Sequence, residues 1–148
     1  FEKRNTIVIG ASCDTPEVHF AWLSTPKDNG GIEGVTYPIL ADSNRNLSSI
    51  LGILDITNET FDEETQTVQV EGDNVTYRAT YLIDEEGMVF HEGINHMPIG
   101  RNVNEYIRLV DAYAHLQSHG EVCPANWEEG KDAMAPNAKG TAEYLASH

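Results

Sequence analysis

The chain has 148 residues, of which 40% are hydrophobic and 22% are charged, a composition typical of one globular domain. Its formal net charge of −15 argues against nucleic acid and against an anionic membrane as partners, because both bind basic surfaces. No apolar run approaches the roughly 20 residues of a membrane-spanning helix. Two cysteines are too few for a disulfide framework, so the cytoplasm is the expected compartment.

The first third of the chain shows strands that alternate with helices. The β-branched run of residues 5–12 predicts a buried parallel strand. Residues 39–52 predict a short strand and then a helix of about two turns, which ends at Gly52. A loop rich in glycine and proline separates the two segments.

Residues 14–24 predict the helix between these strands. Asp14 or Thr15 is its expected N-cap, and Pro16 lies in the first turn. The apolar residues expected on its buried face are Val18, Ala21 and Trp22.

The middle of the chain predicts antiparallel strands. Residues 65–84 alternate at a period of two around a turn at residues 71–74, which predicts a hairpin whose second strand continues to the end of this stretch. A turn at residues 84–87 leads into another antiparallel strand at residues 88–95. The acidic run at residues 62–64 is interpreted as a solvated loop.

The strongest helix pattern covers residues 101–120, and Gly120 is its expected stop. Four apolar residues repeat at the spacing of one helix face: Val103, Ile107, Val110 and Ala114. From Cys123 onward the chain is an arm rich in proline, glycine and alanine, with a last helical segment at residues 141–148.

Four stretches resemble the typical 2-Cys peroxiredoxins of the alkyl hydroperoxide reductase C type. They are HFAWLSTP (19–26), YPILAD (37–42), YRATYLID with MPIGRNVNEYIRLVDA (77–112), and HGEVCPANW (119–127). The resemblance covers nearly the whole chain apart from a longer acidic insertion around residues 55–76, and the motif GEVCPANW is highly specific on its own.

The order of the predicted elements is similar to the C-terminal half of that family's thioredoxin-like α/β sandwich. Residues 1–117 are expected to form this portion of the domain, and residues 118–148 the C-terminal arm. The strand at residues 5–12 needs a neighbour on its other edge. We therefore expect a truncated fold that lacks its N-terminal strands and helix, about a third of a typical domain.

The resemblance implies a thiol peroxidase. In the family, a peroxidatic cysteine attacks hydrogen peroxide or an alkyl hydroperoxide and becomes a sulfenic acid, with which a resolving cysteine of the partner subunit forms an intersubunit disulfide. Cys123 matches the resolving cysteine. The Pro-x-x-x-Thr-x-x-Cys motif of the peroxidatic cysteine is absent from the sequence, and Cys13, which lacks the motif's Pro and Thr, is expected to be a packing residue.

Two arginines match positions of the family's active site. Arg78 matches the active-site arginine, a fixed cation that lowers the pKa of the nucleophile and stabilises charge on the departing oxygen. A surface ion pair is the alternative for Arg78. Arg101 resembles a second arginine that supports the site through an ion pair, and a purely structural role is equally expected for it.

The spacing of His115, His119 and Cys123 would place three metal ligands on one helix face, but Gly120 ends the helix before the third ligand. No metal site is therefore expected, and the resemblance implies no bound cofactor.

The resemblance also implies partners. It implies a homodimer formed through the strand at residues 88–95, assembly into a decamer, and reduction by thioredoxin or a flavoprotein disulfide reductase. The alternative function is a non-catalytic oligomeric holdase chaperone, which only the absent peroxidatic cysteine favours.

Overall fold

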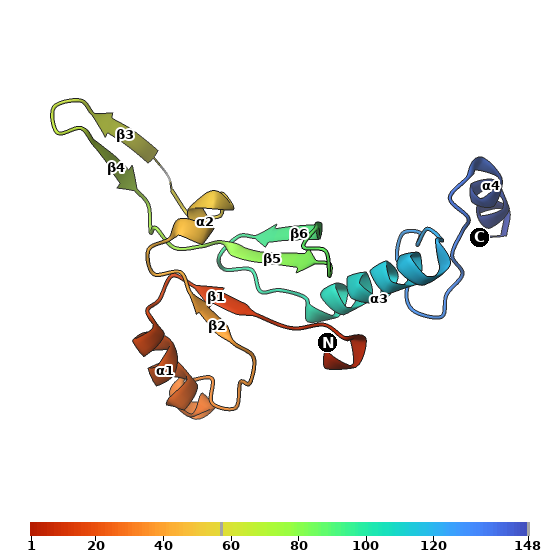
Figure 1. Cartoon of the computed structure of the whole chain (residues 1–148), viewed down its shortest axis with the longest axis horizontal. Helices are drawn as coiled ribbons and strands as arrows, with labels where there is room; N and C mark the ends of the chain where they lie inside the picture. The colour runs from red at the N-terminus through yellow and green to blue at the C-terminus, as the bar shows by residue number, and fades with distance from the viewer. Residues whose placement is uncertain (57, 148) are drawn as a thin grey trace. The chain divides into compact units, whose positions relative to one another are not determined.

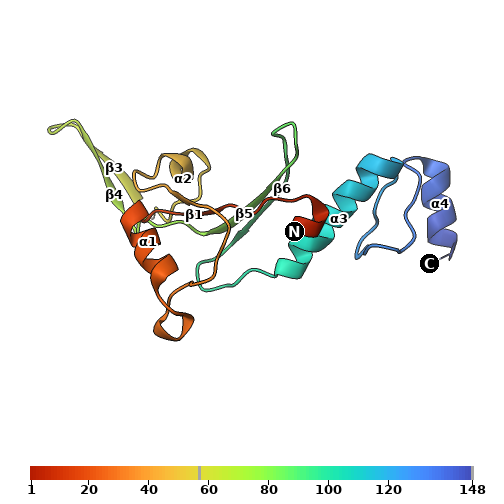
Figure 2. The ribbon, with the colours of Figure 1, turned by 60° about the horizontal axis from the view of Figure 1, so that its bottom comes forward.

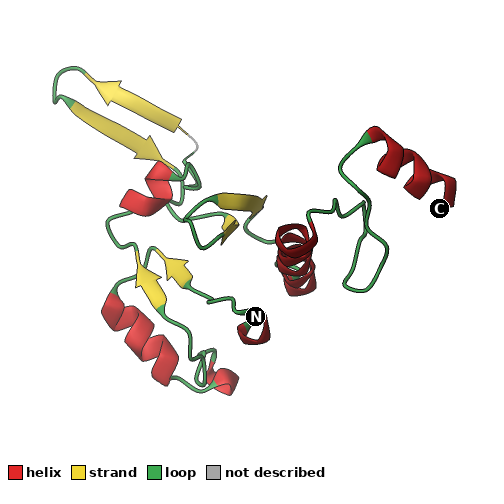
Figure 3. Ribbon diagram, turned by 45° about the vertical axis from the view of Figure 1, so that its right-hand side comes forward, coloured by secondary structure: helices red, strands yellow, loops and turns green. Residues whose placement is uncertain are grey.

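The computed structural model describes residues 1–56 and 58–147, which form mixed α/β structure (Figure 1; Figure 3). The helices are α1 (Pro16–Ser24), α2 (Asn46–Ile50), α3 (Val103–His119) and α4 (Ala138–Ser147), with 3-10 turns η1 (Glu2–Arg4) and η2 (Lys27–Asn29). The strands are β1 (Gly10–Ser12), β2 (Ile39–Ala41), β3 (Asn58–Asp62), β4 (Thr67–Glu71), β5 (Arg78–Ile83) and β6 (Val89–Asn95). Within the described residues, every helix is too short or too polar to span a bilayer.

The chain divides into two compact units. One unit, here called the arm unit, comprises Phe1–Asn5, Tyr81–Glu92 and Arg101–His148. The other, here called the β1–β4 unit, comprises Thr6–Thr80 and Gly93–Gly100. The strands pair as three two-stranded sheets in the described chain, β1 with β2, β3 with β4 and β5 with β6.

The parallel pairing predicted for the first strand is confirmed, but its burial is not. β1 pairs in parallel with β2, with Gly10 opposite Ile39. The strand covers only the last three residues of the predicted segment, and Ile7 and Ile9 are 83% and 66% exposed. A β-branched run is buried only where a second layer covers it, and no described element of this unit covers these two side chains.

Helix α1 begins as predicted but buries a different residue. Thr15 is the N-cap, and its side chain accepts a hydrogen bond from the amide of Val18. The predicted face is wrong, because Val18 and Trp22 remain 48% and 41% exposed whereas His19 is only 4% exposed. His19 Nε2 lies 2.7 Å from Ser12 Oγ, so a polar contact, and not an apolar stripe, joins α1 to the end of β1.

Helix α2 is held to β2 by one buried carboxylate. Asp42 is 6% exposed and accepts hydrogen bonds from the amides of Leu47 (3.1 Å) and Ser48 (2.8 Å), and from the Ser48 hydroxyl (2.5 Å). α2 has five residues, fewer than predicted, and Gly52 follows with φ 65°, as its predicted role as a stop requires.

A hairpin is present in the middle of the chain, but the prediction of its turn is wrong. β3 pairs antiparallel with β4, so the turn is residues 63–66 and not residues 71–74. The carboxylate of Asp62 accepts hydrogen bonds from the amides two and three residues later (2.9 and 3.2 Å), and this side-chain turn reverses the chain early. The acidic run predicted as a solvated loop therefore ends β3 and begins the hairpin tip.

The second predicted turn is confirmed. β5 and β6 are joined at residues 84–88, where Asp84 accepts hydrogen bonds from the amides of Glu86 and Met88. Helix α3 then covers nearly the whole predicted range, and Gly120 ends it with φ 67°. These two signals were local, which is why the sequence revealed them.

The predicted apolar stripe of α3 is half right, because Ile107 and Val110 are half-buried whereas the two residues at its ends are exposed. Val103 is 54% exposed and Ala114 is also exposed. Instead, the ring of Tyr113 stacks on Phe90 of β6 with centroids 4.0 Å apart, and the Tyr113 hydroxyl donates to Asp84 at 2.8 Å. Aromatic pairing thus supplies a packing contact of α3 that the predicted stripe did not include.

The last helix, α4, begins three residues earlier than predicted, because the Asn137 side chain accepts a hydrogen bond from the amide of Gly140 (2.9 Å). The predicted last residue of this helix, His148, lies outside the described residues.

Asp42 should make the stability of the β1–β4 unit depend on pH. The Ser48 hydroxyl is the main reason that the pKa of Asp42 is lowered. Because the folded-state pKa lies below the unfolded value of about 3.9, the stabilisation is complete above that value and is lost as pH falls through the folded pKa. Asp42→Asn should lower the melting temperature at pH 7 and make it less sensitive to acid, as calorimetry between pH 7 and 2 would show. The exposed Asp73→Asn is the matched control, and equal effects of both substitutions would contradict the role of Asp42.

Candidate functional site

Cys123 lies where the chain folds back along α3. The amide of Gly120 donates to the carbonyl of Leu116 (2.8 Å), and the left-handed backbone of this glycine turns the chain back (Figure 2). The half-buried Cys123 then places its Sγ 3.6 Å from the carbonyl oxygen of Ala112. The thiol thus rests against the middle of the helix that precedes it.

A short bridge closes the segment around Cys123 into a loop, here called the Cys123 loop (residues 121–134). Val122 and Met134 exchange two backbone hydrogen bonds, of 2.8 and 3.1 Å. Trp127 lies inside the loop, is only 2% exposed, and donates from Nε1 to the carbonyl of Lys131 at 3.0 Å. The loop therefore has its own small core, next to the thiol.

Trp127 also attaches the loop to α3. Arg108 Nη1 donates to the Trp127 carbonyl at 3.2 Å, and the ring of His115 lies 5.0 Å from the indole. Removing a buried tryptophan typically costs about 3–5 kcal/mol. Trp127 is therefore the main obstacle to opening the loop.

One of the two histidines of α3, His115, contacts the same loop. His115 Nε2 lies 2.9 Å from Glu121 Oε2, an ion pair when the imidazole is protonated, and its ring stacks on that of His119 at 4.3 Å. Across the part of the chain that the structure describes, no three His, Cys, Asp or Glu side chains gather closely enough to hold a metal ion. The contact of His115 with Glu121 fastens the start of the loop, whereas His119 contacts Ser118 and His115 within the helix.

Arg108 supplies a positive charge near Cys123. Glu105 holds its guanidinium with two hydrogen bonds, of 2.8 and 2.7 Å, which fix its orientation. Burial raises the pKa of the Cys123 thiol, the charge of Arg108 opposes that rise, and Glu121 adds to it. The resting thiol is therefore protonated at neutral pH and a weak nucleophile.

The arginines singled out in the sequence lie elsewhere. Arg78, in the β1–β4 unit, begins β5, is exposed, and donates from Nε to the carbonyl of Met97 (3.2 Å). Arg101, in the arm unit, directly precedes Asn102, the N-cap of α3. Since Cys123 contacts Ala112, Arg101 lies about 16 Å from that level along the helix axis. Arg101 and Cys123 are therefore not brought together.

Cys13 follows the end of β1. It is half-buried, and its Sγ lies 3.8 Å from Ser48 Oγ. Its role as a packing residue stays a prediction.

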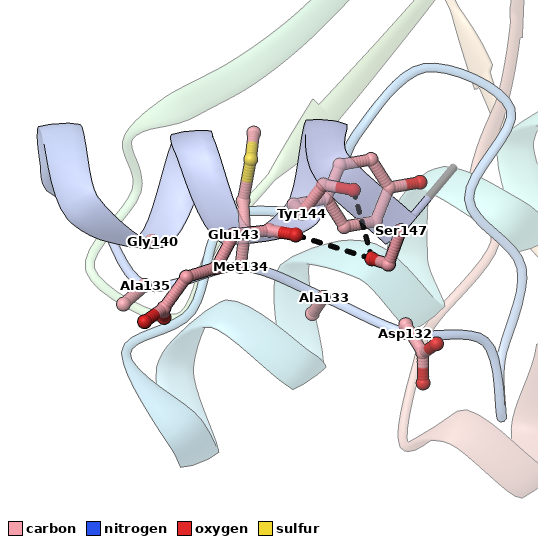
Figure 4. A pocket seen from close by; sticks show the side chains of 8 residues that line it. All are labelled: Asp132, Ala133, Met134, Ala135, Gly140, Glu143, Tyr144 and Ser147. Carbon is pink, nitrogen blue, oxygen red and sulfur yellow. Dashed lines mark hydrogen bonds between the residues drawn. The ribbon is translucent and has the colours of Figure 1, made fainter.

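Helix α4 packs against residues 132–135, at the end of the Cys123 loop. A cavity of about 250 Å³ lies between α4 and residues 132–135 (Figure 4). Beside it, Gly140 is buried, and a Cβ at this position would lie 2.6 Å from the carbonyl oxygen of Ala135. Because the neighbouring Met134 pairs with Val122, the close approach of α4 at Gly140 reinforces the bridge that closes the loop.

Sequence reasoning missed Arg108 and Trp127. Arg108 precedes Ala112 by four residues, which places both on one face of α3. The importance of Arg108 follows only from the contact of Cys123 with Ala112, which no local pattern encodes. Trp127 was part of the quoted motif GEVCPANW, and its position in a breaker-rich arm was the one available signal.

Arg108→Leu should raise the pKa of Cys123 further. The reason is that the opposing positive charge is lost. The measurement is the rate of Cys123 alkylation by iodoacetamide against pH in the reduced protein, followed by mass spectrometry of the Cys123 peptide. Arg108→Lys keeps the charge and is the control. If the alkylation rate has the same pH midpoint in the native protein, in Arg108→Leu and in Arg108→Lys, Arg108 does not act on the thiol.

Gly140→Ala should loosen the Cys123 loop, because the new Cβ would force α4 away from Ala135. A steric conflict of about 1 kcal/mol would raise the alkylation rate of Cys123 about fivefold at fixed pH. Gly100→Ala adds the same methyl group in open space and should leave the rate unchanged. No acceleration in Gly140→Ala would mean that α4 does not restrain the loop.

Comparisons with known proteins identify the family of this chain. Residues 1–92 match the AhpC/TSA family, and residues 112–147 match the C-terminal domain of 1-Cys peroxiredoxin. The chain is 38% identical over 148 residues to Peroxiredoxin-2 of Bos taurus, and 40% identical over 145 residues to alkyl hydroperoxide reductase C of Helicobacter pylori strain 26695. These alignments include 100% and 98% of this chain but 67% and 65% of the relatives.

The solved structures include a similar protein, the reduced 2-Cys peroxiredoxin of Plasmodium vivax. Its TM-score is 0.84 at 37% identity, over 99% of this chain and 67% of that one. The chain thus spans about two thirds of the length of these relatives. Because a family match covers more than half of the chain and relatives match all of it, the chain belongs to the peroxiredoxins, a family of peroxidases with a thioredoxin-like fold.

Proposed function

We propose that the protein containing this chain is a thiol-dependent peroxidase that reduces hydrogen peroxide and alkyl hydroperoxides, and that Cys123 is its resolving cysteine. The observation that carries this proposal is the position of Cys123. It lies in a loop that the backbone hydrogen bonds of Val122 and Met134 close, on an arm that begins where Gly120 ends α3. A resolving thiol must be sheltered at rest and must become mobile when a sulfenic acid is present.

The proposed reaction has three steps. A peroxidatic thiolate of the partner subunit attacks the peroxide, which is reduced to water or an alcohol, and the sulfur becomes a sulfenic acid. The Cys123 thiol then attacks the sulfenic sulfur, so that an S–S bond forms and water leaves. A dithiol of thioredoxin, or of a flavoprotein disulfide reductase, finally supplies two electrons and restores both thiols.

The peroxidatic cysteine of this proposal lies outside these 148 residues. The two cysteines of the sequence are Cys13 and Cys123, and neither follows the Pro-x-x-x-Thr-x-x-Cys pattern. Arg78 is proposed as the active-site cation, since its hydrogen bond to the Met97 carbonyl holds the guanidinium at the start of β5. Arg101 is proposed in a supporting role.

The proposed assembly is a homodimer that forms a decamer in the cytoplasm. Among the described residues, β6 pairs only with β5, so its other edge is open to a second copy. The proposed disulfide would join Cys123 to the peroxidatic cysteine of the neighbouring subunit in such a dimer.

Cys123→Ser should abolish the disulfide-linked dimer that peroxide induces in the full-length protein, and with it thioredoxin-dependent turnover. Cys13→Ser should keep both, because Cys13 takes no part in the reaction. Non-reducing gel electrophoresis after one equivalent of hydrogen peroxide is the measurement.

A dimer that survives Cys123→Ser would contradict the role of Cys123. No peroxide consumption by the native protein would instead favour the alternative, a non-catalytic holdase chaperone.

A further inference from the structure

The β3–β4 hairpin stands apart from the rest of the β1–β4 unit. Among the described residues, its two strands pair only with each other, so both outer edges are unpaired (Figure 1). Its base is fixed, because Leu54 and Thr76 form an antiparallel bridge and the Tyr77 hydroxyl donates to Asp55 at 2.8 Å. A two-stranded hairpin is marginally stable alone, and an open edge is a template for another strand.

One face of the hairpin carries an exposed apolar pair. Phe61 and Val68 are directly opposite each other in the antiparallel register, which places them on the same face. Their side chains are 55% and 58% exposed. Asp62 and its partner Thr67, the next pair along, lie on the other face. The hairpin thus presents one face with this apolar pair and Glu59, and a second, polar face with the carboxylates of Asp62 and Glu71.

Every charged side chain of the hairpin itself is acidic, and Arg45, whose Nε donates to the carbonyl of Asn74 at 2.7 Å, is a cation at its base. No Lys, Arg or His occurs between Arg45 and Arg78. The acidic residues of the hairpin and its base are Asp55, Glu59, Asp62, Glu63, Glu64, Glu71 and Asp73. Two copies of this hairpin would repel each other, whereas a basic partner would be attracted.

We propose that an open edge of the β3–β4 hairpin is a docking site for an extended basic segment of a partner protein, in which cationic and apolar residues alternate. Such a segment would add as a third strand through backbone hydrogen bonds. Because side chains alternate between faces, its apolar residues would extend the face of Phe61 and Val68, and its cations would extend the face of Asp62. This site is separate from Cys123 and does not depend on peroxidase activity.

The probe is a fluorescent seven-residue peptide of alternating lysine and valine, titrated into the reduced full-length protein at low salt. Phe61→Ser should weaken binding about tenfold, because it removes the aromatic side chain of the apolar pair. Ile50→Ser is the matched control, since Ile50 is 83% exposed but lies on α2. It should leave the dissociation constant unchanged.

A second pair of variants tests the charge. Glu63→Gln with Glu64→Gln should weaken binding about fivefold, because two exposed charges at the hairpin tip are neutralised. Glu85→Gln with Glu86→Gln changes the net charge equally at the exposed β5–β6 turn and should have little effect. Thermal unfolding of each variant confirms that the fold is kept.

Three results would overturn the proposal. The first is equal weakening by the two charge variants, which would indicate attraction to net charge alone. The second is equal weakening by Phe61→Ser and Ile50→Ser. The third is equally tight binding of a peptide with the same composition in separate lysine and valine blocks, because that peptide cannot match the alternating faces of a strand.

Discussion

The burial of Trp127 is the contact on which the arrangement around Cys123 depends. Its indole is 2% exposed, although it lies in a segment without a helix or a strand of its own. Arg108 binds its carbonyl, Lys131 accepts from its Nε1, and the His115 ring packs beside it. If the indole left this position, these contacts would break together, and the free energy of loop opening therefore includes most of the free energy of tryptophan burial.

This constraint explains the chemistry of the resting thiol. Burial beside α3 raises the pKa of Cys123 and thereby keeps the sulfur protonated, which protects it from peroxide and from other thiols. Arg108 lies close enough to limit that rise, and it also binds the loop through the Trp127 carbonyl. Arg108 thus links the pKa of the Cys123 thiol to the closed position of the loop. Opening the loop would restore both the mobility and the acidity that the proposed resolving reaction needs.

Local signals were readable in the sequence, and tertiary ones were not. Thr15, Pro16 and Gly120 mark helix ends through hydrogen bonds and dihedral angles of neighbouring residues. The sequence identified Pro16 and Gly120, and it left the N-cap open between Asp14 and Thr15. The hairpin turn was misplaced because Asp62 forms a side-chain turn that competes with the glycine-containing turn at residues 71–74.

The packing partners could not be read from periodicity. The burial of His19 accompanies its hydrogen bond with the Ser12 hydroxyl. Tyr113 packs α3 against its neighbours because it stacks on Phe90 and donates to Asp84. The motif around Cys123 identified the thiol and the family. The proximity of Arg108 depends on the return of the arm along α3, a non-local arrangement that residue spacing does not encode.

The most direct test of the release of Cys123 is the fluorescence of Trp127 in the full-length protein, in a Trp22→Phe background that leaves Trp127 as the only tryptophan of these 148 residues. Any tryptophan elsewhere in the full-length protein is replaced in the same way. The emission spectrum is recorded in the reduced state and again after one equivalent of peroxide has formed the disulfide. We expect a shift to longer wavelength, because the indole becomes exposed to water when the loop opens. An unchanged spectrum in a protein whose disulfide is shown by mass spectrometry to contain Cys123 would contradict the role of Trp127 in restraining the thiol.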